Sequence, residues 1–287
     1  MPALPLAKRL PSLDGIVAAH AALRAGRPLV QCLTNVVSAN FMANVLLAAG
    51  ASPAMVDNPE EAAGFAKVAG AVLVNLGTPT AAQVESMRLA VQAANAAGRP
   101  WVLDPIGAGG LPWRGAVAAE LLRQNPAVVR GNASEIIGLA GLGEGAPGFD
   151  SSDDPAQAVP AAVELLRQCQ AVSASGPVDH VLGWVGDSPD SAVPRLLRIG
   201  GGSALLPRVT ASGCALGALV AAYLAVSEDA FMALSAAHVH FAVASELAEE
   251  GSRGPGTFAS LFLDALDAVD AALIRQRAQL MPEQSGA

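Results

Sequence analysis

The chain has 287 residues, of which 52% are hydrophobic and only 15% are charged, and its net charge is −8. This length suffices for one large α/β domain or two small ones, and the apolar composition indicates a large core with further apolar surface covered by self-association. The negative charge argues against nucleic acid or an anionic membrane as a partner, because both are bound largely through Lys and Arg.

The cysteines and the N-terminus bear on the cellular compartment. Cys32, Cys169 and Cys214 form no C-x-x-C pair, so neither a disulfide framework nor a zinc site is indicated. The segment MPALPLAKRLPSL lacks the unbroken apolar stretch of a signal peptide, and the longest apolar run, residues 214–226, is too short to span a bilayer. We therefore expect a cytoplasmic protein with reduced thiols and no membrane partner.

Short apolar strands alternate with helical patterns through the first 176 residues. Turn residues or helix caps separate them, as at Asn58, where a cap is followed by Pro and two acids. Continuous apolar strands joined by helices indicate a parallel sheet covered on both faces. The expected strands are 28–34, 52–56, 71–77, 101–103, 127–129 and 171–176, and the expected helices include 114–124 and 156–168.

The last third of the chain differs from the rest. Residues 178–199 hold two β-prone segments around a turn, which predicts antiparallel strands at the sheet edge. After residue 213 the chain is mostly helical to about 279, enough for three helices, and we expect a disordered tail from about residue 280. Residues 141–155 have the composition of a mobile loop. With no repeat and no clear boundary, residues 1–287 are predicted to form a single three-layer α/β domain.

The most informative segment is the turn Ala211-Ser212-Gly213 before a long apolar helical pattern. A helix that begins there directs free N–H groups and the positive end of its dipole toward an anion, which small side chains allow to approach. Cys214 lies in the first turn, where the thiolate is favoured. This suits phosphoryl transfer, although the segment alone is better explained as a tight turn before a buried helix with an apolar Cys.

Polar residues also follow the predicted strands, at the edge of an open parallel sheet where ligands bind. Asp104 precedes a Gly-rich loop and can hold Mg²⁺ or its water, or simply cap that loop. Arg130 can contact a phosphate through two hydrogen bonds, and Glu135 is placed to reach a cation. The alternative is that Asn132 and Glu135 form a capping box and Arg130 is a solvated charge.

Two further strand ends carry weaker signals. Ser175 offers a hydroxyl that can meet a nucleotide phosphate, and Thr34, Asn35 and Met55 can line a small apolar pocket. For each, a plain turn or ordinary loop and core residues is the alternative. The histidines follow none of these strand ends and are interpreted as structural or surface residues: His20, His180, His238 and His240.

Seven short motifs occur in order over nearly the whole chain, and together they resemble the hydroxyethylthiazole kinase family of the ribokinase-like superfamily. They are TN-x-V at 34–37, NPEE at 58–61, NLGT at 75–78, LDPIGAG at 103–109, RGNASEI at 130–136, TASGCAL at 210–216 and GPGTF at 254–258.

This resemblance implies a ribokinase-like fold and an ATP- and Mg²⁺-dependent kinase. The acceptor would be the hydroxyl of 4-methyl-5-(2-hydroxyethyl)thiazole, in thiamine biosynthesis and salvage, and the assembly a homotrimer with the thiazole near subunit interfaces. Carried over by motif, the resemblance implies that Asp104 and Glu135 hold the metal and that the ATP contacts are Arg130, Ser175 and Asn132. It implies that the substrate contacts are Met55, Asn35, Thr34 and Ala211. The anion hole would consist of Ala211, Ser212, Gly213 and Cys214, with Cys214 in the position of the catalytic base.

The chain departs from the family pattern at two positions. It has Ala211 where the family usually has Gly, and Gln31 where the family often has His. Backbone contacts of the anion hole survive the first change if φ is negative at Ala211. Two other functions stay open at this point: a kinase for another small alcohol such as hydroxymethylpyrimidine, which would be expected to have an acid in place of Cys214, and a non-catalytic thiazole-binding protein.

Overall fold

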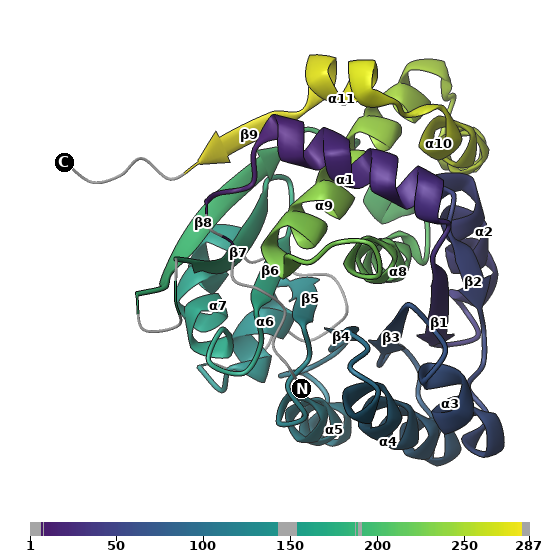
Figure 1. Cartoon of the computed structure of the whole chain (residues 1–287). Coiled ribbons are helices and arrows are strands. Elements are labelled where there is room, and N and C mark those ends of the chain that lie inside the picture. The colour runs from purple at the N-terminus through teal and green to yellow at the C-terminus, as the bar shows by residue number, and fades with distance from the viewer. Residues whose placement is uncertain (1–6, 8, 143–153, 187, 189–190, 283–287) are drawn as a thin grey trace.

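The computed structural model describes residues 7, 9–142, 154–186, 188 and 191–282. Its centre is a nine-stranded sheet in the order β2-β1-β3-β4-β5-β6-β7-β8-β9 (Figure 1). The strands are β1 Leu29–Leu33, β2 Ser52–Ala54, β3 Ala71–Asn75, β4 Trp101–Asp104, β5 Val128–Asn132, β6 Ala171–Ser175, β7 Asp179–Val185, β8 Val193–Gly200 and β9 Gln279–Pro282.

The first six strands are parallel and the last three extend the sheet with antiparallel pairs. The predicted mostly parallel sheet with an antiparallel edge is therefore confirmed. Parallel strands need crossover connections, which the helices supply. Asn75 pairs with Asp104 and Asn132 pairs with Ser175, so polar residues from several strands meet at the carboxyl edge of the sheet.

Helices cover both faces of the sheet, as expected (Figure 1). One face carries α1, α2 and α8–α11, and the other carries α3–α7. The helices are α1 Leu13–Gly26, α2 Ala39–Ala49, α3 Pro59–Ala66, α4 Ala81–Ala96, α5 Pro112–Leu122, α6 Ala133–Leu139, α7 Val159–Leu165, α8 Ser212–Leu224, α9 Ala230–Gly251, α10 Pro255–Ala268 and α11 Ala271–Arg277, with 3₁₀ turns η1 Pro155–Ala158 and η2 Leu206–Arg208.

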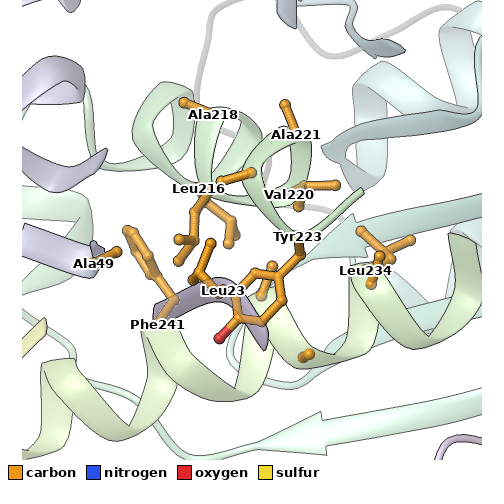
Figure 2. Packing of buried hydrophobic residues seen from close by; sticks show 14 of the residues in the cluster. Leu23, Ala49, Leu216, Ala218, Val220, Ala221, Tyr223, Leu234 and Phe241 are labelled. Atoms are coloured by element: carbon orange, nitrogen blue, oxygen red, sulfur yellow. The ribbon is translucent and has the colours of Figure 1, made fainter. Parts of the chain in front are cut away.

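The helix α8 lies at the centre of the larger core and packs on β1, β3 and β4. Every residue from Ala215 to Leu224 is buried, and Figure 2 shows side chains of α8 packed with Leu234 and Phe241 of α9 and with Leu23 of α1. A helix that is apolar on all sides belongs in a core, where both the sheet and other helices cover it. The packing therefore fixes where the N-terminus of α8 meets the sheet.

The helix α9 is long and apolar enough to cross a membrane, but 78% of its most apolar window is buried inside the protein. It packs on α8, α10 and the antiparallel strands, which is the setting of a core helix. All four histidines are buried, so they are structural and none is a surface residue. His240 Nδ1 pairs with the Tyr223 hydroxyl at 3.0 Å, and His238 Nδ1 lies 2.6 Å from Asp179 Oδ2.

The C-terminal predictions need two corrections. Four helices follow residue 213 instead of three, because Asp270 accepts a hydrogen bond from Leu273 N–H and caps a separate helix, α11. The predicted disorder from about residue 280 is wrong for residues 280–282, which belong to β9 and supply backbone partners to β8, an otherwise exposed sheet edge. Residues 283–287, and 143–153 of the predicted loop, lie outside the described residues.

Candidate active site

The carboxyl edge of the parallel strands and the N-terminus of α8 meet at one place. Asp104 ends β4, Arg130 lies in β5, and both approach the first two turns of α8. A Cβ atom on Gly213 would lie 3.2 Å from Arg130 Nη1, and one on Gly217 would lie 3.3 Å from Asp104 Oδ2. Absent side chains at these two positions let the helix backbone come close to a cation and a carboxylate.

The first turn of α8 presents free backbone donors. Its first intrahelical hydrogen bond runs from Ala215 N–H to Ala211 O at 2.9 Å, so the N–H groups of Gly213 and Cys214 have no acceptor within the helix. The Ser212 hydroxyl donates to Leu206 O at 3.0 Å and anchors the turn to the preceding 3₁₀ segment. The expected anion hole at residues 211–214 therefore has the backbone geometry of an anion-binding helix start.

Ala211 is in the left-handed region, with φ +72° and ψ −2°. A change from Gly to Ala would leave the turn unaffected only if φ were negative, and at Ala211 it is positive. A residue with a Cβ atom pays a steric cost in this conformation, which Gly does not. Ala211 therefore holds a strained backbone position at the entrance to the predicted anion hole.

Arg130 connects the carboxylate of Asp104 to Ser175 at the end of β6. Its Nη2 donates to Ser175 Oγ at 3.0 Å, and its Nη1 lies 3.8 Å from Asp104 Oδ1. Arg130 is buried, so the alternative of a solvated charge is wrong. A buried guanidinium near free helix N–H groups is suited to bind a phosphate through several hydrogen bonds.

Two buried carboxylates lie at this edge of the sheet. Burial raises the pKa of Asp104 to about 7, opposed by the nearby Arg130 charge and reinforced by the negative charge of Glu135. Burial also raises the pKa of Glu135, although backbone hydrogen bonds from Asn132 and Gly107 oppose the rise. A cation bound between them would lower both values, since opposite charge favours the ionised form.

Glu135 also has a structural role. Its Oε2 accepts a hydrogen bond from Asn132 N–H at 2.8 Å, and Asn132 Oδ1 accepts one from Glu135 N–H at 2.9 Å. This is the capping box that the sequence left as an alternative. Glu135 Oε1 also accepts from Gly107 N–H at 3.2 Å, so the cap fixes the carboxylate against the Gly-rich loop after Asp104.

Cys214 is half-buried at the same helix start, but it is not the favoured thiolate that the sequence predicted. Burial and the nearby Asp104 carboxylate raise the pKa of the Cys214 thiol above its ordinary value, and contacts to Asn75 and the Arg130 charge offset this only in part. Desolvation and a neighbouring negative charge both favour the protonated thiol. Cys214 is therefore a thiol at neutral pH.

The expected substrate contacts fall into two groups. Thr34 and Asn35 are buried and hydrogen-bonded within the β1–α2 connection, with Thr34 Oγ1 2.9 Å from Ser38 Oγ. Met55 follows β2 and is partly exposed. The two connections are linked by Gln83, whose Nε2 donates to Thr34 O and Asp57 Oδ2 at 3.2 and 3.0 Å.

Gln31, at the position where the family often has His, is fully buried in β1. Its Nε2 donates to Val56 O at 2.9 Å and to Ala62 O at 3.1 Å, so it holds the segment that follows Met55. Sequence reasoning gave no role to Asn75, which donates from Nδ2 to Asp104 Oδ2 at 2.7 Å. The signal that was available is its place at the end of a buried strand, inside the NLGT motif.

A ribokinase-like sheet with an anion-binding helix start, a buried arginine and two carboxylates at its carboxyl edge defines a small-molecule kinase. The hydroxyethylthiazole kinase family model matches residues 21–272, and the chain belongs to this family. As a kinase it is a phosphotransferase that uses ATP as co-substrate.

Individual relatives agree. A hydroxyethylthiazole kinase of Rhodococcus erythropolis is 58% identical over 94% of both chains, and one of Kineococcus radiotolerans is 52% identical over 91% of this chain and 92% of its own. A solved structure of a hydroxyethylthiazole kinase protein from Pyrococcus horikoshii matches with TM-score 0.83 and 34% identity, covering 94% of this chain and all of that one. A pyridoxal kinase from Staphylococcus aureus, 16% identical with TM-score 0.56 over 76% of this chain and 88% of that one, shares the fold.

The strain at Ala211 predicts that Ala211→Gly raises the free energy of unfolding by about 0.5–1 kcal/mol, because the relief of the left-handed cost exceeds the added unfolded-state entropy. Ala18→Gly, at an exposed position inside α1, is the matched control and should lower the free energy of unfolding by about 0.5–1 kcal/mol. Urea denaturation measures both. A lower stability for both variants would contradict the strain.

Proposed function

We propose that the protein transfers the γ-phosphoryl group of ATP to the hydroxyl of 4-methyl-5-(2-hydroxyethyl)thiazole, giving the thiazole phosphate for thiamine biosynthesis and salvage in the cytoplasm. The observation that carries the proposal is the meeting of Arg130, Asp104 and the free N–H groups of α8 at one point. Phosphoryl transfer passes through a loose transition state, so positioning and charge stabilisation supply most of the catalysis. The acceptor is inferred from the relatives, which are hydroxyethylthiazole kinases.

In this proposal the ends of different strands contribute different groups of residues to the site. Arg130 and Ser175, with Asn132 at the same edge, contact ATP, and the Gly213 and Cys214 N–H groups stabilise charge on the transferred group. Met55 contacts the thiazole. Because Thr34 and Asn35 are buried and engaged with Ser38, they shape the pocket from behind instead of touching the substrate directly.

Mg²⁺ is the proposed metal, held by Asp104 and Glu135. Asp104 Oδ1 is buried and has no hydrogen-bond partner among the described residues, which is an acceptor suited to a cation or its water. The described residues contain no group of three or more His, Cys, Asp or Glu able to hold a metal, but Mg²⁺ needs only one or two carboxylates when phosphates and waters complete its shell. When bound, it would neutralise phosphate charge.

A homotrimer is the proposed assembly. Apolar side chains at the carboxyl ends of β1 and β2 are exposed, with Val36 at 84% and Val37 at 58%, and Met55 lies on the neighbouring connection. Exposed apolar groups beside a polar site are typical of a surface that a second copy covers. Light scattering at micromolar concentration should give three times the 28.8 kDa chain mass, and a monomer would contradict the proposal.

The activity is tested by ADP release from ATP and Mg²⁺ with the thiazole alcohol, and the product is identified by mass spectrometry. We expect turnover with this alcohol well above that with hydroxymethylpyrimidine, the control acceptor. Binding of the thiazole without ADP formation would favour a non-catalytic binding protein. Faster turnover of the pyrimidine would assign the enzyme to another alcohol.

Substitutions of Cys214 test its role in proton transfer. Cys214→Ala should lower kcat about 10- to 1000-fold. We expect a value near the lower end of this range, because Cys214 is already a protonated thiol before substrates bind. Cys214→Ser should have a similar effect on kcat. Cys214→Asp should remain active, since a carboxylate is a competent base there and gains from the helix dipole. Steady-state kinetics measures all three. A folded Cys214→Asp enzyme slower than Cys214→Ala would make Cys214 a packing residue.

A further inference from the structure

Asn75, the last residue of β3, joins three segments at the site through a buried side chain. Its Oδ1 accepts hydrogen bonds from Asn35 Nδ2 at 2.9 Å and from Gly77 N–H at 3.1 Å. Its Nδ2 donates to Asp104 Oδ2 at 2.7 Å. The ends of β1, β3 and β4 are thus connected through one amide group.

The orientation of this amide is fixed by its backbone partner. The N–H group of Gly77 can only donate, so the oxygen of Asn75 faces it, and the nitrogen faces Asp104. The amide of Asn35 is fixed in the same way, because Ser38 N–H donates to Asn35 Oδ1 at 3.0 Å. The nitrogen of Asn35 therefore points to Asn75 and lies 4.0 Å from Cys214 Sγ.

This chain of donors makes the two oxygens of Asp104 different. Oδ2 accepts from Asn75 and lies against α8 at Gly217. Oδ1 is buried without a hydrogen-bond partner among the described residues and lies 3.8 Å from Arg130 Nη1. Because Asn75 donates to Oδ2 of Asp104, Oδ1 is the oxygen that stays available beside Arg130.

We propose that Asn75 is a positioning residue of the phosphotransfer site: it holds Asp104 so that Oδ1 is available next to Arg130, and it turns the N–H group of Asn35 toward Cys214. This inference rests on the proposed function for its kinetic consequences. The contact itself can be tested in the protein without substrate.

The contact is tested first by exchanging the two polar groups. Asn75→Asp keeps both acceptor contacts but places a carboxylate against Asp104, which should lower the melting temperature. Adding Asp104→Asn restores the hydrogen bond in the reverse direction, because the new amide at position 104 donates to the new carboxylate at position 75. We expect the double variant to recover at least half of the melting temperature lost in Asn75→Asp. A double variant less stable than both single variants would overturn the contact.

The positioning role is tested by the split between kcat and KM. Asn75→Leu keeps the branched shape of the side chain but removes all three hydrogen bonds. We expect kcat to fall about 10- to 100-fold, as for outer partners of catalytic ligands, with the KM for the thiazole alcohol changed less than about threefold. In an Asp104→Asn background the same substitution should cause little further loss. A full additional loss there would show that Asn75 acts independently of Asp104.

The matched control is Asn95→Leu, in the last turn of α4 and next to the first residue of β4. Asn95 also bridges two segments, donating to Gln124 O at 2.8 Å and accepting from Trp101 Nε1 at 3.1 Å. It should lose stability while its kcat stays near that of the parent. If kcat fell equally in Asn75→Leu and Asn95→Leu, the loss of activity would be explained by general destabilisation of the protein. That result would overturn the proposal.

A second variant leaves Asn75 unchanged. A Cβ atom on Gly77 would lie 2.0 Å from Asn35 Nδ2, so Gly77→Ala must displace the amide that Asn75 holds. We expect kcat to fall in this variant also, and an unchanged kcat would contradict the part of the proposal that concerns Asn35. A parent protein without kinase activity would instead overturn the proposed function, and the exchange experiment would still decide the contact.

Discussion

The structure depends on accommodating one carboxylate, that of Asp104, inside the protein. The side chain is fully buried at the end of β4, where an uncompensated charge would cost several kcal/mol. Arg130 at 3.8 Å, the amide of Asn75 at 2.7 Å and the start of α8 offset this cost. Burial still prevails, as the raised pKa of about 7 shows.

This constraint explains the small residues in α8. Gly213 and Gly217 lie one turn apart, and a methyl group at either position would contact Arg130 or Asp104 within about the closest distance that side chains tolerate. A side chain at either position would therefore require Arg130 or Asp104 to shift by a few tenths of an ångström. The same electrostatics acts on Cys214, since burial and the negative charge of Asp104 both raise the pKa of its thiol.

Much of this arrangement was predictable from the sequence, because the order of strands, helices and turn residues determines an open parallel sheet, and polar residues at strand ends then meet at one edge. The helix start at residues 211–214, Asp104 and Arg130 were found this way. Other features depend on three-dimensional context. The φ angle of Ala211 and the burial of Arg130 are set by tertiary packing. The pKa of Cys214 is raised by burial and by the carboxylate of Asp104, which lies 110 positions earlier in the sequence. The strand β9 was missed since its partner, β8, is distant in sequence.

The buried polar network also limits where an acceptor alcohol can be recognised. Asn35 uses its oxygen for Ser38 and its nitrogen for Asn75, and Thr34 pairs with Ser38, so these side chains are committed within the chain. What the same edge leaves exposed is apolar: Val36, Val37 and Met55. An apolar ring can gain contact there only if another surface closes over it. In the proposed trimer, selectivity for the acceptor would be coupled to assembly, whereas Arg130 and Asp104 would act on phosphate within one chain.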